Sequence, residues 1–253
     1  MKRTCLLALL VIASWLYAHE KYVTVDSQKY RVKEMGQGNI TVVFESGMSD
    51  SIENWQSIPD SIAKIAKVFL YDRPGIGKSD SATTPRTLPN HVKELHDLLN
   101  YENIHPPYVF VGHSLGGFIT RYYISQHPEQ VKGLLLLDPA AEAWWYQMSA
   151  KELQEYKKGG DEVYRSRPRG QQQEWEEFLP NMEYMRNLKI PEQIPVILIS
   201  ASAWEWYKYH KKIIKGHKNS KHVELTGSHY IHQDHPDKTI QYIKDLLQTA
   251  GAQ

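Results

Sequence analysis

The sequence predicts an α/β protein with a mostly parallel, doubly wound sheet and a helical cap inserted between two of its strands. Short apolar runs of strand length recur along the chain, and amphipathic helical stretches separate them. This alternation is typical of a parallel sheet that helices cover on both faces. One stretch, residues 141–188, contains no strand-like run, which indicates the helical insertion.

The strands are expected in one hairpin and six later runs. Residues 22–25 and 29–33 alternate like the two strands of a hairpin. The later runs are apolar, and the first four of them end at turns that contain glycine or proline. These runs are residues 40–45, 67–71, 108–111, 131–137, 195–199 and 221–225.

Helices are expected between these strands, at residues 58–66, 89–99, 118–126 and 239–247. Within the second of them, Val92, Leu95 and Leu98 recur at a helical spacing. The pair His235-Pro236 predicts the start of the final helix, because proline suits the first helical position.

The chain is expected to divide into a core, residues 19–139 and 191–253, and a cap, residues 140–190. Helices within the cap are expected at residues 149–157 and 171–188. An insertion at this point would lie over the carboxyl ends of the strands, where open α/β sheets bind ligands.

Residues 1–18 predict a signal peptide or an N-terminal anchor. Lys2 and Arg3 precede an apolar run, and Ala18 is a small residue at which cleavage would occur. We therefore expect an exported protein, whether secreted, periplasmic or membrane-anchored, with membrane association only through this segment. The single cysteine, Cys5, would be removed with it, and a chain without cysteine suits an oxidising compartment.

Composition excludes several classes of protein. The chain has 30 basic and 29 acidic side chains and a formal net charge of +1, whereas nucleic-acid binding needs a clear basic excess. One cysteine excludes an internal disulfide and a cysteine-rich zinc site. We expect a small-molecule substrate and no nucleic acid, and the oligomeric state stays open.

The strongest chemical signal is the motif Gly-His-Ser-Leu-Gly at residues 112–116. It lies between an expected strand and an expected helix, which is the context that a G-x-S-x-G nucleophile elbow requires. Its glycines leave room for a sharp turn that raises Ser114 above the sheet edge at a helix N-terminus. Ser114 is the predicted nucleophile.

A serine hydroxyl needs a general base. Of the 12 histidines, His229 follows the last apolar run and precedes the last helix, so it is expected at the same sheet edge as Ser114. His113 is expected to pack within the elbow. The polar cluster at residues 229–235 fits no familiar metallohydrolase spacing, so neither a metal nor a cofactor is expected.

The acid that orients the base stays open between three candidates. Asp138 ends the fourth apolar run and lies between Ser114 and His229 in the chain. Glu205 follows the fifth run, and Glu142 is a further candidate. We favour Asp138, because no aspartate follows the fifth run.

An oxyanion hole needs backbone N–H groups aimed at the developing negative charge. Leu115, directly after the nucleophile, is expected to supply one. The second is expected from Met48, because Gly47 lets the loop after the first core strand turn so that this N–H points inward.

Together these residues resemble the α/β-hydrolase fold family over residues 24–247. Segments similar to its landmarks occur in the family's order at residues 44–51, 71–79, 112–117 and 227–230. The resemblance implies the triad order Ser114, Asp138, His229 and a structural role for residues 72–79. The family usually carries its acid after the next-to-last core strand, and some members carry it one strand earlier, where Asp138 stands.

A serine at the elbow implies acyl transfer to water, whereas family members with aspartate there open epoxides or displace halide. We expect a serine hydrolase that cleaves a small, partly apolar carboxylic ester, lactone or thioester through an acyl-enzyme. Trp144, Trp145 and Trp175 are candidates for lining the substrate pocket or for anchoring the cap. Two alternatives are an amide hydrolase similar to proline-releasing aminopeptidases and a catalytically silent binding module.

Overall fold

A computed structural model describes residues 19–203 and 206–252 of the chain. The predicted signal segment at residues 1–18 and the candidate acid Glu205 lie outside the described residues.

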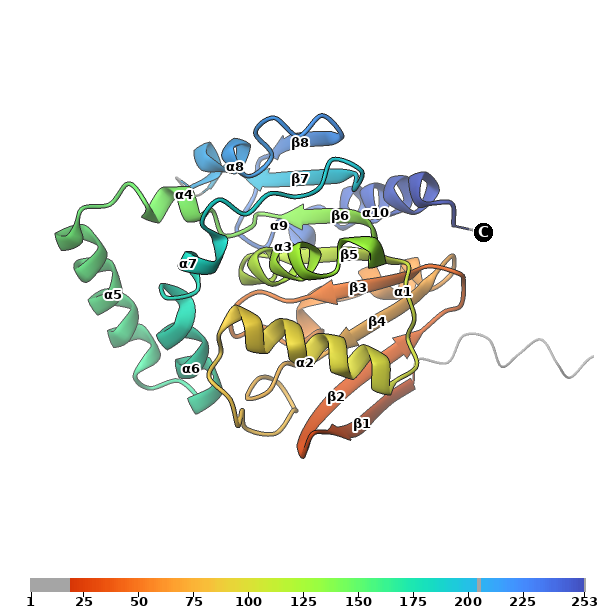
Figure 1. The fold of residues 1–253 in the computed structure, drawn as a ribbon, viewed down its shortest axis with the longest axis horizontal. Helices are drawn as coiled ribbons and strands as arrows, with labels where there is room; N and C mark the ends of the chain where they lie inside the picture. Colours follow the sequence, from red (N-terminus) through yellow and green to blue (C-terminus); the bar gives the residue numbers. More distant parts are fainter. Residues whose placement is uncertain (1–18, 204–205, 253) are drawn as a thin grey trace, which may run out of the picture.

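Eight strands form one sheet in the order β1-β2-β4-β3-β5-β6-β7-β8 (Figure 1). β1 and β2 form an antiparallel hairpin, and β2 also pairs antiparallel with β4. All remaining pairs are parallel. The strands are β1 His19–Val25, β2 Gln28–Met35, β3 Thr41–Glu45, β4 Lys67–Tyr71, β5 Tyr108–His113, β6 Val131–Leu137, β7 Val196–Ala201 and β8 Ser220–Leu225. The predicted hairpin, the six runs and the mostly parallel sheet are confirmed.

Helices cover both faces of the sheet, so β3, β5 and β7 are buried along their whole length. α2 and α3 pack on one face in a core that also includes the strand side chains Phe69 and Phe110. α1 and α10 pack on the other face around Val42 and Leu135. These four helices are α1 Ile58–Ile62, α2 Leu88–Tyr101, α3 Leu115–Gln126 and α10 Pro236–Ala250.

The helix ends follow local chemistry. The side chain of Thr87 accepts a hydrogen bond from the N–H of Asn90 and caps α2. α10 begins at Pro236, as predicted, and ends at Gly251 in the left-handed conformation. The short helices α8 Tyr207–Ile213 and α9 Ile231–Asp234 were not expected, because neither is long enough to show a helical period.

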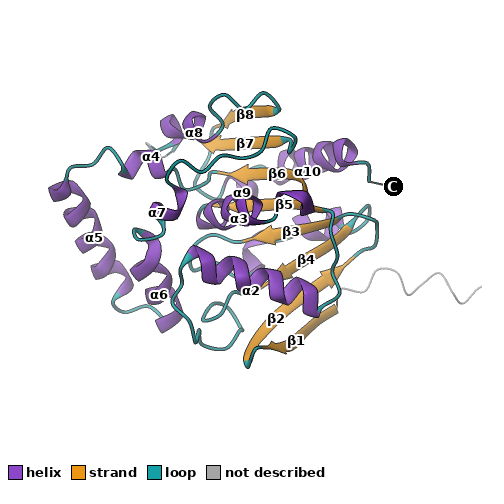
Figure 2. Cartoon of the chain, in the orientation of Figure 1, coloured by secondary structure: helices purple, strands orange, loops and turns teal. Residues whose placement is uncertain are grey.

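Four helices lie between β6 and β7, where the insertion was expected (Figure 2). They are α4 Glu142–Trp145, α5 Ala150–Tyr164, α6 Arg169–Phe178 and α7 Met182–Met185. α5 begins with a capping box between Ser149 and Glu152 and runs beyond the expected end at residue 157. The expectation of one helix over residues 171–188 is wrong. Pro180 has no N–H to donate, and α6 and α7 lie on either side of it.

The arrowheads of β6 and β7 in Figure 1 point toward the side of the molecule on which these four helices lie. The loops that follow β3, β5, β6 and β8 leave the sheet at this edge and carry the candidate site residues. In residues 19–203 and 206–252, no helix has both the length and the apolar character needed to cross a membrane.

Candidate active site

Ser114 occupies a strained turn between β5 and α3. Its φ is 52° and its ψ is −116°, a conformation that a non-glycine residue adopts at a cost of about 1–3 kcal/mol. The turn brings α3 so close to β3 that a Cβ atom on Gly116 would lie 2.1 Å from the carbonyl oxygen of Glu45. The motif therefore needs glycine at this position.

Backbone hydrogen bonds hold this turn against the end of β6. The N–H of Ser114 donates to the carbonyl oxygen of Leu137 over 3.2 Å. The carbonyl oxygen of Ser114 accepts from the N–H of Ala140 over 3.0 Å and from that of Gly117 over 2.9 Å. The serine is thus fixed next to the segment that carries Asp138.

Asp138 and His229 are hydrogen-bonded, with 2.7 Å between Oδ2 and Nδ1. The carboxylate is fully buried and accepts two more hydrogen bonds, from the N–H of Ala201 at 2.8 Å and from Nε1 of Trp206 at 3.2 Å. An ionised carboxylate only accepts, so Nδ1 of His229 carries the proton and Nε2 is left as the basic nitrogen.

His113 holds His229 at the same edge as the elbow. Nε2 of His113 donates to the carbonyl oxygen of His229 over 2.8 Å, and the two ring centroids lie 4.6 Å apart. His113 is the residue before Ser114, so this contact brings the loop after β8 close to Ser114. His113 therefore packs within the elbow, as expected.

The environment of His229 favours its neutral form. Burial lowers the pKa of His229 below its usual value, the hydrogen bond from Nδ1 to Asp138 partly restores it, and the nearby His113 lowers it further. A neutral imidazole can accept the proton of a serine hydroxyl.

Two backbone N–H groups next to the elbow are open to a ligand. Met48 lies in the loop after β3, residues 46–50, which we call the β3 loop, and Leu115 is the first residue of α3. Over the part of the chain that the structure describes, neither N–H donates a hydrogen bond. Unsatisfied N–H groups of this kind can bind a developing oxyanion.

A family model described as the alpha/beta hydrolase fold matches residues 40–171, half of the chain. The chain belongs to the α/β-hydrolase fold family. The match covers β3 to β6 and the start of the insertion, which includes the elbow at Ser114.

Relatives extend the likeness over nearly the whole of this α/β-hydrolase-fold protein. The uncharacterized protein YqjL of Bacillus subtilis (strain 168) is 28% identical over 237 residues, which are 88% of this chain and 89% of that protein. The structure of the enol-lactonase from Burkholderia xenovorans LB400 matches with a TM-score of 0.70 and 16% identity over 90% of this chain and all of that one. A thermophilic esterase matches with a TM-score of 0.66 and 18% identity over 94% of this chain and all of that one. The family match supports a hydrolase, and the two solved structures show that the fold is shared.

The other acid candidates in this α/β-hydrolase-fold protein differ from Asp138. Both oxygens of Glu142 pair with Arg121, at 2.7 and 2.9 Å. Burial alone would raise the pKa of Glu142, but Arg121 outweighs it and holds the pKa below its usual value. Glu142, in the first turn of α4, is thus held in an ion pair with α3 and is not the partner of His229 in the structure. Glu205 lies outside the described residues.

The polar side chains at residues 229–235 have separate hydrogen-bond partners in the structure. Nε2 of His232 donates to the carbonyl oxygen of Asn54, and Nε2 of His235 donates to that of Thr226. Asp234 accepts hydrogen bonds from the N–H and hydroxyl of Ser228. Each of these side chains thus hydrogen-bonds to a different partner in the protein.

The three candidate tryptophans occupy different environments. Trp175 is buried and donates from Nε1 to Asp161, so it joins α6 to α5. Trp145 is buried against Phe178, with ring centroids 5.2 Å apart. Trp144 is only partly buried, and its ring and that of Trp145 lie 6.0 and 5.7 Å from that of Trp206.

Trp206 is a site residue that sequence reasoning missed. It donates to Asp138, and its ring centroid lies 5.1 Å from that of His229. One feature of the sequence could have indicated this role: Trp206 lies in the loop after the fifth apolar run, where this family usually carries its acid.

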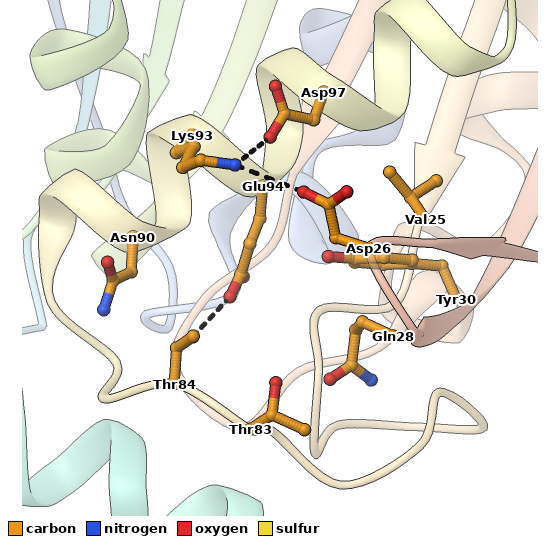
Figure 3. A pocket seen from close by; sticks show the side chains of 10 residues that line it. All are labelled: Val25, Asp26, Gln28, Tyr30, Thr83, Thr84, Asn90, Lys93, Glu94 and Asp97. Atoms are coloured by element: carbon orange, nitrogen blue, oxygen red, sulfur yellow. Dashed lines mark hydrogen bonds and ion pairs between the residues drawn. The ribbon is translucent and has the colours of Figure 1, made fainter.

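A separate pocket of about 140 Å³ lies between the β1–β2 hairpin and α2 (Figure 3). No predicted site residue lines it. Its charged side chains are all paired: Lys93 bridges Asp26 and Asp97, and Glu94 pairs with Arg86 and accepts a hydrogen bond from Thr84. The Ser114 site therefore remains the candidate active site.

Proposed function

We propose that this protein is a serine hydrolase that cleaves a small, partly apolar carboxylic ester, lactone or thioester through an acyl-enzyme. The observation that carries the proposal is the 2.7 Å hydrogen bond between His229 and a fully buried Asp138, placed at the elbow of Ser114. Such a constellation converts a weak hydroxyl into a nucleophile.

In the acylation step, Oγ of Ser114 bonds to the substrate carbonyl carbon while its proton passes to Nε2 of His229. The carbonyl π pair moves onto oxygen, and the N–H groups of Met48 and Leu115 stabilise that charge. Asp138 stabilises the imidazolium. The oxyanion then collapses, the bond to the leaving oxygen or sulfur breaks, and the leaving group takes the proton from Nε2.

In the deacylation step, water attacks the acyl carbon and gives its proton to Nε2 of His229. The second tetrahedral intermediate collapses, the bond to Oγ breaks, and Oγ recovers the proton. These residues complete the reaction without a metal or cofactor, so turnover should survive exhaustive treatment with EDTA.

The aromatic side chains near His229 support a partly apolar substrate. Trp206 and Trp144 extend from the histidine toward the helices between β6 and β7. Flat aromatic surfaces suit an acyl chain. The relatives named as an esterase and an enol-lactonase support ester and lactone chemistry.

The test uses a fluorophosphonate probe followed by a substrate panel. The wild-type protein should be labelled at Ser114 and should turn over p-nitrophenyl esters, with lactones, thioesters and proline anilides as comparison substrates. Ser114→Ala should fold normally, resist labelling and lose roughly 10³-fold or more of ester turnover. An unlabelled wild-type protein, or a fully active Ser114→Ala, would reject the acyl-enzyme.

We also propose that residues 1–18 direct export. The basic residues and apolar run support this proposal. N-terminal sequencing of the protein expressed at full length should give His19 as the first residue, while a retained Met1 on a membrane-bound protein would indicate an anchor.

A further inference from the structure

A buried arginine donates hydrogen bonds to backbone carbonyl groups of the β3 loop. Arg73, which follows β4, is 2% exposed. Its Nη1 donates to the carbonyl oxygen of Ser46 over 2.7 Å, and its Nη2 donates to that of Gly47 over 2.6 Å. Nη1 also donates to Glu45 over 2.8 Å. The planar guanidinium therefore fixes two successive peptide groups of the loop.

The remaining donor of this arginine binds α6, which lies in the segment between β6 and β7. Nε of Arg73 donates to Oε1 of Glu174 over 2.7 Å. The other carboxylate oxygen, Oε2, accepts the N–H of Ser49 over 2.7 Å. Glu174 is 1% exposed. One carboxylate from α6 thus holds both the arginine and the far end of the β3 loop.

Sequence spacing explains how Glu174 reaches the core. Gly170, Glu174 and Phe178 follow one another every four residues and share one face of α6. At Gly170 the helix touches the loop after β4, because a Cβ atom there would lie 1.9 Å from the carbonyl oxygen of Gly75. Phe178 stacks on Phe118 of α3, with centroids 6.0 Å apart. Glu174, between these two contacts, is carried into the core.

This arrangement determines where the N–H of Met48 points. In a trans peptide the C=O and N–H groups point in opposite directions. The carbonyl of Gly47 points at Arg73, so the N–H of Met48, in the same peptide group, points away from Arg73. The N–H of Ser49 is occupied by Glu174. The N–H of Met48 is therefore left unpaired and given a defined direction.

We propose that Glu174, acting through Arg73 and the β3 loop, is a positioning residue for the oxyanion donor at Met48. The inference rests on the proposed serine hydrolase function. Docking of α6 on the core would then be a condition for transition-state stabilisation. Substrate binding in the ground state would not depend on Glu174, since its carboxylate faces Arg73 and Ser49.

A purely structural role makes a different prediction. Removing one partner from a buried, hydrogen-bonded charge cluster destabilises a protein whatever its function. The distinguishing readout is the affinity for a trifluoromethyl ketone. Oγ of Ser114 adds to the ketone carbon, its proton passes to His229, and the carbonyl π pair becomes an oxyanion in the hole. This affinity reports the oxyanion donors in protein that is already folded.

The main variant is Glu174→Gln, which keeps the shape of the side chain but cannot accept both hydrogen bonds without turning an NH₂ group toward one donor. We expect kcat for a p-nitrophenyl ester to fall about 10- to 100-fold, because a small misplacement of a catalytic group has effects of this size. KM should change less than about twofold, and trifluoromethyl ketone affinity should fall by the same factor as kcat.

The matched control is Glu176→Gln, on the same helix. The side chain of Glu176 is 51% exposed and pairs with the exposed Arg169, so kcat and ketone affinity should stay at wild-type values. If Glu174→Gln lowers the melting temperature but leaves both quantities unchanged, the positioning role is rejected and the contact is only structural.

A second variant keeps the test informative if Glu174→Gln does not fold. Glu174→Asp keeps the charge but shortens the side chain, so it cannot reach Arg73 and Ser49 together, and it should lower kcat and ketone affinity in parallel. Wild-type values in whichever variant folds would overturn the inference. Failure of the proposed function looks different, because the wild-type protein itself would then show no Ser114-dependent turnover and no ketone binding.

Discussion

Nδ1 of His229 lies 2.7 Å from Oδ2 of Asp138, although 91 residues separate the two in the chain. Asp138 follows β6, one strand earlier than the family's usual position for the acid. The neighbouring strand still contributes, because the end of β7 supplies the N–H of Ala201 and the loop after it supplies the indole of Trp206 to the same carboxylate. An acid after β6 is thus stabilised by donors from the neighbouring strand.

Asp138→Asn should abolish most of the activity. An amide cannot stabilise the imidazolium, and its NH₂ group would favour the wrong tautomer of His229, so kcat should fall about 10⁴-fold. Steady-state kinetics on a p-nitrophenyl ester measure the change. Glu142→Gln is the control, since Glu142 pairs with Arg121, and it should affect stability more than turnover. If Glu205→Gln proves the more damaging change, the acid is misassigned.

The pH dependence of turnover should show a single acid limb. Burial lowers the pKa of His229, so the rate should rise with pH through an apparent pKa below about 6.5 and then level off. A pH profile of kcat/KM between pH 4 and 9 measures it. A limb centred above pH 7, or a bell-shaped profile, would contradict a buried histidine acting as the base.

Folding stability should fall on acidification because buried histidines resist protonation. Burial lowers the pKa of His210 to about 4, while its hydrogen bond to Pro139 and the charge of Asp138 act in the other direction. Above about pH 6.5 both the folded and the unfolded chain hold this imidazole neutral. Between about pH 6.5 and 4 only the unfolded chain binds the proton, so the free energy of unfolding declines by roughly 1.4 kcal/mol per pH unit for this group.

Urea denaturation at several pH values in this window measures that slope. His210→Gln keeps a donor for the carbonyl of Pro139 and should make the slope shallower by about the amount of one histidine. His105→Gln, which changes an exposed ring before β5, should leave the slope as it is. Equal slopes in the wild type and His210→Gln would show that His210 does not contribute.

The tryptophans should separate into two functions. Trp144→Ala should change the ratio of kcat/KM between short and long acyl chains by about threefold to tenfold, because this partly buried ring lies 6.0 Å from that of Trp206, which packs beside His229. Trp175→Phe removes the donor to Asp161 and should cost about 1 kcal/mol of stability while keeping chain-length selectivity. An ester panel and thermal melts measure the two effects. Altered selectivity in Trp175→Phe alone would reverse the assignment.

Local sequence patterns were sufficient to predict the strands of the sheet and the position of the elbow. Strands buried on both faces must be continuously apolar, so β3 to β7 were visible as runs, and β3 to β6 ended near glycine- or proline-containing turns. The elbow could be located because its backbone conformation requires small neighbours beside Ser114. Parallel strands end at one edge, which is why His229 could be placed near Ser114 without any contact being known.

Partners that come from distant segments depended on tertiary structure. The sequence favoured Asp138 over Glu142 and Glu205 but left the choice open. The packing of Glu142 against Arg121 and of Asp138 against His229 separates the two described candidates. Two helix ends in residues 140–190 also differed from prediction: α5 runs on to Tyr164, and α6 ends at Phe178, before Pro180.

The contacts of Trp206 with Asp138 and of Glu174 with Arg73 have no signature in the local hydrophobic pattern of the sequence. A hydrogen bond between residues 68 or 101 positions apart depends on how whole elements pack, and neither member of such a pair changes the local hydrophobic pattern. Local chemistry therefore determined the fold and the position of the candidate nucleophile, Ser114. The buried polar partners around them were decided by the docking of the helices that follow β6 and of the loop that follows β7.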